Sequence, residues 1–146
     1  MKYLCTNCNY IYDTAFGDDE EEVNIGQELD MCPVCEEYDT FHGIEEEVNY
    51  IDDNSRLESI EIEHFPEVII EGDKLVVSVG NEIHPMGEDH RIASVSLYDE
   101  YGDLIEEKYL ELEEEPRVVF DFDDLDEYEI RVKCSQHGVW GKRFVN

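Results

Sequence analysis

Apolar and polar residues alternate in short runs along the chain from residue 60 onward. Isoleucine alternates with glutamate in residues 60–64, and residues 128–134 show a longer run of the same kind. This period of two is typical of a strand with one buried face, and no run has a convincing helical period. The pattern predicts strands at residues 60–64, 74–79, 92–98, 104–112, 118–122 and 128–134. Short strands separated by turns predict an all-β sandwich or barrel.

The same alternation places two metal-binding residue types at strand ends. Tyr128, Ile130 and Val132 share one face of their predicted strand, and Cys134 continues that face. In residues 60–64 the two isoleucines share a face, and His64 continues it. Both side chains are therefore expected on the apolar side of a strand end, as a site at one end of a sandwich requires.

The first 45 residues carry a different signal, a Cys-x-x-Cys pair that occurs twice. The four cysteines are Cys5, Cys8, Cys32 and Cys35, with 23 residues between the two pairs. Two such turns can place four thiolates at the corners of a tetrahedron, which suits zinc or iron. Two disulfides are the alternative, disfavoured by the odd fifth cysteine and by the lack of an apolar signal-peptide stretch.

These patterns divide the chain into three parts. Residues 1–45 form a four-cysteine metal domain, because so short a segment needs a metal to fold firmly. Residues 46–58 are expected to be a polar linker. Residues 59–146 form the β-domain.

Charge narrows the classes of function. The chain of 146 residues has 40 acidic and 10 basic side chains, a formal net charge of −30. This balance excludes nucleic-acid binding through Lys and Arg and argues against docking on anionic membranes. No apolar run is long enough to span a bilayer, so a soluble, cytoplasmic protein is expected. A salt-rich cytoplasm that screens the charges and an ordinary, very soluble surface remain alternative explanations.

Histidines and the fifth cysteine suggest a second metal site. Cys134 and His137 lie three residues apart, and His84 and His90 flank a short loop containing Pro and Gly. With His64 these residues can supply mixed nitrogen and sulfur ligands. Spacing alone leaves this site undecided, because no local motif joins the three segments.

Two family resemblances bear on both sites. The segment Cys5-Thr-Asn-Cys8-Asn-Tyr-Ile-Tyr-Asp13, followed by Gly17-Asp18 and Cys32-Pro-Val-Cys35, resembles rubredoxin. Rubredoxins usually have Gly after each second Cys and Trp just before the second pair. Here Asn9 and Glu36 stand at the Gly positions, and residues 29–31 contain no Trp. The four ligands are intact, and the choice between iron and zinc stays open.

Residues from about 60 to 146 resemble the superoxide reductase (desulfoferrodoxin/neelaredoxin) family. The resemblance rests on His64-Phe-Pro66, Val79-Gly80, His84-Pro-Met86, His90, Cys134 and His137-Gly-Val-Trp140. It implies an immunoglobulin-like β-sandwich in which His64, His84, His90 and His137 surround an iron and Cys134 is the axial thiolate. It further implies two irons per chain, reduction of superoxide to hydrogen peroxide at the ferrous Fe(His)4Cys centre, and a rubredoxin-type centre for electron transfer. His42 is left over as a surface or packing residue.

The sequence departs from this family at two adjacent positions beside the site. The family commonly has Glu-Lys directly before the first His ligand, and the Lys is held to attract superoxide. Here the two residues are Ile62 and Glu63, which places an anion near a site for an anionic substrate. Glu63 therefore belongs to the candidate catalytic residues, and Glu61 or Glu63 as a carboxylate ligand of the ferric iron is a further alternative.

Three functional hypotheses remain open. The first is a superoxide reductase that receives electrons from rubredoxin or a similar donor. The second, favoured by the missing Lys, is a non-catalytic two-metal electron carrier or redox sensor. The third is a zinc-ribbon interaction module fused to a β-sandwich, which the lack of a basic surface disfavours. The family resemblance also implies a homodimer.

Overall fold

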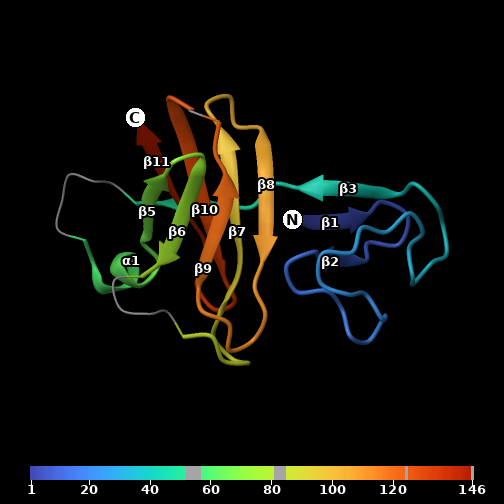
Figure 1. The fold of residues 1–146 in the computed structure, drawn as a ribbon. Helices are drawn as coiled ribbons and strands as arrows, with labels where there is room; N and C mark the ends of the chain where they lie inside the picture. The colour runs from blue at the N-terminus through green and yellow to red at the C-terminus, as the bar shows by residue number, and fades with distance from the viewer. Residues whose placement is uncertain (52–56, 81–84, 124, 146) are drawn as a thin grey trace. The chain divides into compact units, whose positions relative to one another are not determined.

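The structure, a computed structural model, describes residues 1–51, 57–80, 85–123 and 125–145. Contacts divide the chain into two compact units, Met1–Glu46 and Glu47–Asn146. Figure 1 follows the chain through both units. The second unit is built mainly from β-strands, as the alternation of apolar and polar residues predicts for residues 59–146.

The first unit is a small three-stranded antiparallel sheet. Its strands are β1 (Lys2–Cys5), β2 (Ile11–Asp13) and β3 (Phe41–Ile44), in the order β2-β1-β3. Aromatic rings supply much of its packing, with Tyr12 lying 5.3 Å from Tyr3 and 5.0 Å from Phe41 between ring centroids. Few residues are fully buried in this unit, which fits the expectation that a metal contributes to its stability.

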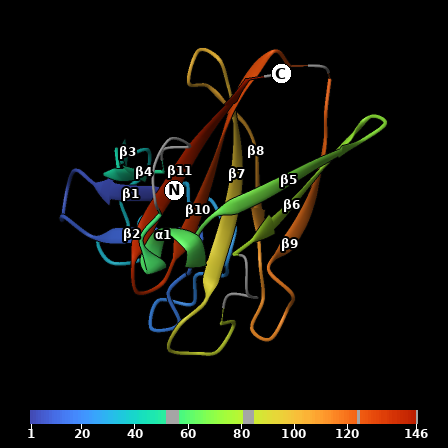
Figure 2. The ribbon, with the colours of Figure 1, turned by 90° about the vertical axis from the view of Figure 1, so that its left-hand side faces the viewer.

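The second unit contains two sheets that pack as a β-sandwich (Figures 1 and 2). The five-stranded sheet has the order β4-β11-β10-β7-β8, and the three-stranded sheet has the order β5-β6-β9. Their bounds are β4 (Val48–Tyr50), β5 (Pro66–Glu71), β6 (Lys74–Val79), β7 (Ile92–Asp99), β8 (Leu104–Tyr109), β9 (Arg117–Asp121), β10 (Glu127–Cys134) and β11 (Gly138–Val145). The predicted fold class is thus confirmed: mainly β, with a four-cysteine knuckle and a sandwich-like pair of sheets.

Alternating apolar residues of both sheets form the core. Leu75 and Phe120 from the small sheet, and Ile130 and Val132 from the large one, are fully excluded from solvent. The inward face predicted for residues 128, 130, 132 and 134 is buried as expected. The residue that ends this face, Cys134, is 3% exposed.

The prediction of a strand at residues 60–64 is wrong. Residues Ser59–Glu63 form a short helix, α1, and His64 follows at its C-terminal end. Glu58 and Glu61 close the first turn reciprocally as a capping box. The spacing of Ile60 and His64 fits one helix face as well as a strand, so the apolar alternation was ambiguous in so short a run.

Three strands of the second unit were not predicted. Residues 48–50, placed in the linker, form β4, which pairs parallel with β11 at Val48↔Val139. Pro66 begins β5, and a proline argues against a strand unless the strand is at an edge, as β5 is. In β11, Gly138 and Gly141 interrupt the alternation of apolar and polar residues that would predict a strand.

Gly141 permits the close approach of β4. A Cβ at this position would lie 2.7 Å from Cγ1 of Val48 and 3.2 Å from the Tyr50 ring. The Gly141 carbonyl also accepts a 2.8 Å hydrogen bond from the N–H of Ile51, which is 5% exposed. A residue without a side chain is therefore required where β4 pairs with β11.

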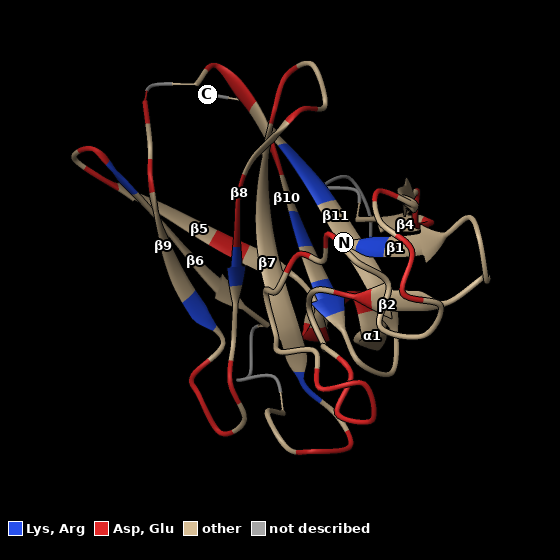
Figure 3. Ribbon diagram, turned by 90° about the vertical axis from the view of Figure 1, so that its right-hand side faces the viewer, with Lys and Arg blue, Asp and Glu red and all other residues tan. Residues whose placement is uncertain are grey.

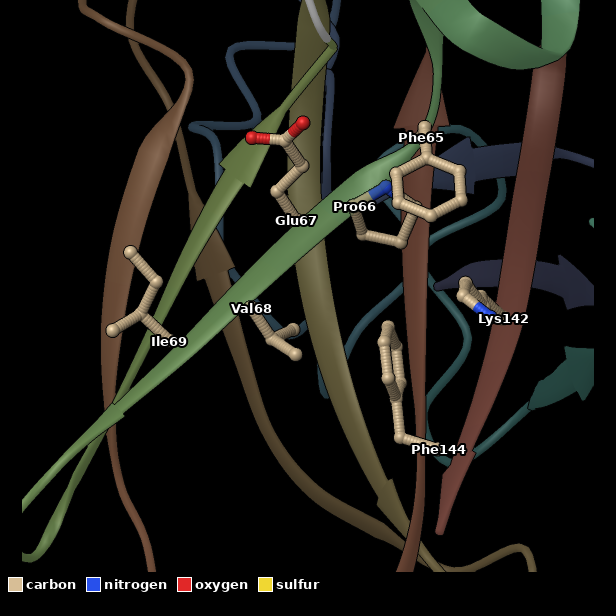
Figure 4. A pocket seen from close by; sticks show the side chains of 7 residues that line it. All are labelled: Phe65, Pro66, Glu67, Val68, Ile69, Lys142 and Phe144. Atoms are coloured by element: carbon tan, nitrogen blue, oxygen red, sulfur yellow. The ribbon is translucent and has the colours of Figure 1, made fainter. Parts of the chain in front are cut away.

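A groove of about 440 Å³ lies between the edge strand β5 and β11. Figure 4 shows the rings of Phe65 and Phe144 on either side of Lys142, with the carboxylate of Glu67 directed away from them. The Lys142 ammonium lies 5.6 Å from the Phe65 centroid and 4.8 Å from that of Phe144. Lys142 is 4% exposed, so its alkyl chain belongs to the packed interior beside Phe65.

Charged residues are unevenly distributed over the second unit. Figure 3 shows blue segments for Lys and Arg on β10 and β11, and red loops for Asp and Glu. The acidic run of residues 113–115 is exposed. In the first unit Asp18 is different, because its carboxylate accepts a 2.7 Å hydrogen bond from the Tyr10 hydroxyl.

Candidate metal centres

Two knuckle-shaped turns bring the four N-terminal cysteines together. The first turn closes with a hydrogen bond of 2.9 Å from the N–H of Asn9 to the carbonyl of Cys5, and the second with an equal bond from Glu36 to Cys32. Asn9 and Glu36 have positive φ values of 67° and 63°. These are the positions at which rubredoxins usually have Gly, so the left-handed backbone is kept without the glycine.

The sulfur atoms fit a tetrahedral metal. Cys5 and Cys35 have their Sγ atoms 3.8 Å apart, and those of Cys8 and Cys32 are 3.6 Å apart. A tetrahedron with metal–sulfur bonds of about 2.3 Å has edges of about 3.8 Å. All five cysteines are free thiols, so the alternative of two disulfides is wrong. The donor set suits zinc or iron equally.

Hydrogen bonds favour ionised sulfur at Cys5 and Cys35. The pKa of Cys8 is raised instead, because its backbone hydrogen bond at Tyr10 is outweighed by burial and the neighbouring sulfurs. Burial acts to raise the pKa of Cys5, but donors from Thr40, Cys8 and Asn7 outweigh it and lower the pKa to about 6. The Asn7 side chain and the backbone of Glu37 lower the pKa of Cys35. Thiolates rather than thiols are metal ligands, so these donors favour the ligand form of Cys5 and Cys35.

A second cluster forms at one end of the sandwich. One ligand atom from each of His64, His90, Cys134 and His137 lies within 4.8 Å of every other. Donors on one ion, with bonds of about 2.0–2.3 Å, lie up to about 4.5 Å apart. The four side chains therefore fit a common metal. His84, the fifth predicted ligand, lies outside the described residues.

Each of the four side chains comes from a different local structure. His64 directly follows α1, His90 precedes β7, Cys134 ends β10, and His137 lies in the turn before β11. The sulfur of Cys134 is 3.7 Å from Nδ1 of His137. Gly138 follows with a φ of 78°, which lets the chain reverse directly after the His.

His64 is held by two contacts that the sequence pattern did not reveal. Its Nδ1 atom lies 2.6 Å from the carbonyl oxygen of Ile60, one helical turn earlier. A hydrogen bond there leaves Nε2 as the ligand atom. The ring also stacks on Trp140, with centroids 5.1 Å apart at 13°. The spacing of four residues and the capping box were the signals of this helical turn.

Trp140 also organises the turn that carries His137. Its indole N–H donates a 3.0 Å hydrogen bond to the carbonyl of His137. The ring of His137 stands nearly perpendicular to those of His64 and His90, at 5.1 and 4.9 Å. Trp140 thus contacts both the ring of His64 and the backbone of His137, and the sequence identified it only as part of a motif.

Burial sets the charge state of the ligands. It lowers the pKa of His64 and raises the pKa of Cys134, which favours the uncharged forms. Glu63 acts electrostatically on both groups and raises the pKa of each. Glu63 is exposed, and it therefore lies close to the cluster without being buried in it.

Two other residues from the sequence analysis lie elsewhere. The Glu61 carboxylate accepts a 3.0 Å hydrogen bond from the N–H of Glu58 and so closes the start of α1. His42 is exposed on β3, opposite Leu4 in the sheet of the first unit.

The fold and the two clusters define a class of protein: a β-sandwich with a His/Cys metal cluster, joined to a rubredoxin-like four-cysteine knuckle. A family model for desulfoferrodoxin matches residues 58–143. The chain belongs to the desulfoferrodoxin family.

Similar proteins include a desulfoferrodoxin homolog from Archaeoglobus fulgidus. It is 34% identical over 77 residues, which are 53% of this chain and 59% of that protein's length. A superoxide reductase (1Fe-SOR) from Giardia intestinalis has a TM-score of 0.52 at 21% identity, over 57% of this chain and 98% of its own. A superoxide reductase (neelaredoxin) from Ignicoccus hospitalis has a TM-score of 0.51 at 23% identity, over 67% and 92%. At these identities the two structures show a shared fold.

Among the described residues, no helix has the length and apolar character needed to cross a membrane.

Proposed function

We propose that this chain is a superoxide reductase. The reaction combines superoxide, one electron and two protons to give hydrogen peroxide. The observation that carries the proposal is the convergence of His64, His90, Cys134 and His137 within 4.8 Å, inside the segment that matches the desulfoferrodoxin model. With His84 these are the metal ligands of the proposal, and the metal is iron.

A ferrous iron bound there would supply the electron. The residues of the chain prepare its ligands: the Ile60 carbonyl fixes the tautomer of His64, and Trp140 holds both the ring of His64 and the His137 turn. Cys134, 3% exposed, contributes a thiolate shielded from water. Neutral imidazoles leave the site cationic, which suits an anionic substrate.

The four-cysteine cluster is proposed to hold a second iron that passes electrons. Its sulfur atoms fill the coordination shell of a tetrahedral ion, so substrate has no position there. A rubredoxin or similar protein is the proposed electron donor. Zinc at this cluster would instead make the first unit structural.

A non-catalytic electron carrier or redox sensor is the second candidate. One observation favours it: Glu63 places a carboxylate whose charge reaches both His64 and Cys134. That charge repels superoxide, and the net charge of −30 adds long-range repulsion.

Metal analysis and a stoichiometric assay test the proposal. Protein purified anaerobically should contain about two irons per chain, or one iron and one zinc if the first unit is structural. The reduced protein should give one peroxide per superoxide without releasing oxygen, whereas dismutation gives one peroxide and one oxygen per two superoxides. Cys134→Ser is the control, because it removes the only sulfur ligand of the catalytic cluster. Absence of iron, or no peroxide beyond that of spontaneous dismutation, would contradict the reductase assignment.

A further inference from the structure

The hydroxyl of Thr40 lies next to one sulfur of the four-cysteine cluster. Its Oγ1 atom is 3.1 Å from Sγ of Cys5, and Cys5 is fully buried. Once Cys5 is a thiolate, only the hydroxyl has a proton to donate. The contact is therefore a charge-assisted hydrogen bond in any metal-loaded form of the protein.

Neighbouring residues fix Thr40 in place. Its carbonyl accepts hydrogen bonds from the backbone N–H of Thr6 at 2.9 Å and from the Thr6 hydroxyl at 3.0 Å. The following residue, Phe41, pairs with Cys5 in the register of β1 and β3. The backbone of Thr40 is thus held beside Cys5, and the Thr40 side chain contacts the Cys5 sulfur.

The two knuckles have the same backbone turn but different donors. In the first knuckle Asn7 precedes Cys8, and its side chain lies close enough to the sulfur of Cys35 to lower the pKa of that thiol. The corresponding residue of the second knuckle is Val34, which has no polar side-chain atom. Cys5 and Cys35 are the sulfurs 3.8 Å apart, so side-chain donors converge on one edge of the tetrahedron.

Hydrogen bonds to ligand sulfur favour the more negative state of a metal centre. Reduction of a ferric iron by one electron adds negative charge that the four thiolates share, and donors to sulfur are a known determinant of such potentials. We propose that Thr40, through its hydroxyl on Cys5, raises the reduction potential of an iron held by the four cysteines. Asn7 acts in the same direction on the adjacent sulfur. The inference rests on the proposed iron at this cluster.

The test is a redox titration of the full chain reconstituted with ferrous iron, followed by the thiolate-to-iron absorption of the four-cysteine centre. Thr40→Val removes the hydroxyl at nearly constant volume. At a fixed potential it should lower the ratio of reduced to oxidised centre by about fivefold to tenfold. A tenfold change corresponds to about 59 mV for one electron. Thr40→Ser keeps the donor and should retain the wild-type potential. Asn7→Leu should shift the potential in the same direction as Thr40→Val.

Thr14→Val is the matched control. The Thr14 hydroxyl lies in the same unit but contacts the amine and the carbonyl of Met1 rather than sulfur, so its loss should affect stability and leave the potential unchanged. An equal shift in Thr14→Val, or no shift in Thr40→Val, would overturn the inference while leaving the proposed function intact. Failure of the four cysteines to give the iron absorption would overturn the iron assignment, and the inference with it.

Discussion

Replacement of Gly141 by Ala should displace β4 from the sandwich. The added Cβ would lie 2.7 Å from Cγ1 of Val48, about 1 Å inside the usual carbon–carbon contact. Overpacking of this kind costs about 1–3 kcal/mol. The Gly141 backbone does not have a positive φ, so Ala is not strained there and gains about 0.4–1 kcal/mol by restricting the unfolded chain. The expected net loss in the free energy of unfolding is about 1–2 kcal/mol.

Urea unfolding followed by tryptophan fluorescence measures this loss. Trp140 is the only tryptophan of the chain and lies in the second unit beside Gly141, so the signal reports that unit. Gly87→Ala is the control: Gly87 has no positive φ, and a Cβ there would meet no atom within 4 Å. Its free energy of unfolding should be unchanged or slightly higher.

A double variant separates steric conflict from a general intolerance of Ala. Val48→Ala removes the methyl that the new Cβ would meet, so the combined variant Val48→Ala with Gly141→Ala should lose less than the sum of the two single variants. Contacting residues typically couple by about 0.5–3 kcal/mol. Strict additivity, or an unchanged stability of Gly141→Ala alone, would refute the account of β4 docking.

Three further predictions concern charge and backbone strain. Glu36→Gly should stabilise the metal-loaded first unit by about 0.5–1 kcal/mol, because Glu36 has a φ of 63°, which is strained for a residue with a Cβ. Denaturation followed by metal–thiolate absorption measures this gain in stability. A loss of stability would contradict the backbone strain at Glu36. Glu63→Lys should raise the second-order rate with superoxide roughly threefold or more at low ionic strength and much less at 1 M salt; an equal rate at low salt argues against electrostatic repulsion by Glu63. The Tyr10 hydroxyl lowers the pKa of Asp18 from its usual 3.8, so the bond stabilises the fold above that pH and this contribution is lost as pH falls through the lowered pKa. Tyr10→Phe should raise the Asp18 pKa in an NMR titration, and an unchanged value would show that the hydroxyl is not its cause.

The strands of the sandwich core could be predicted from the sequence where one face is apolar and the other polar. Residues 128–134 are the clearest case, and they end at Cys134 as expected. Elements with a short or interrupted pattern could not be predicted in this way. Ile60 and His64 fit a helical turn as well as a strand, and only the reciprocal bonds of Glu58 and Glu61 distinguish the two.

The clusters show a similar division between local and distant information. Each Cys-x-x-Cys turn is a local unit, so the four-cysteine site followed from spacing. The second cluster joins residues from α1, the segment before β7 and the β10–β11 turn. Spacing left that site undecided, and it was expected only because the residues resemble a known family. Contacts such as the carbonyl of Ile60 on His64 depend on a backbone conformation that the residue pattern did not reveal.

The pairing of β4 with β11 has a consequence for the order of assembly during synthesis. The residue pair Val48 and Val139 closes a loop of about ninety residues, and such distant contacts form slowly. The first unit draws its internal contacts from residues 1–46, so its four cysteines can emerge from the ribosome and capture a metal while the sandwich is still incomplete. The cluster that contains His64 can form only after Cys134 and His137 have been synthesised. The two metal centres should therefore be loaded in sequence, the four-cysteine centre first.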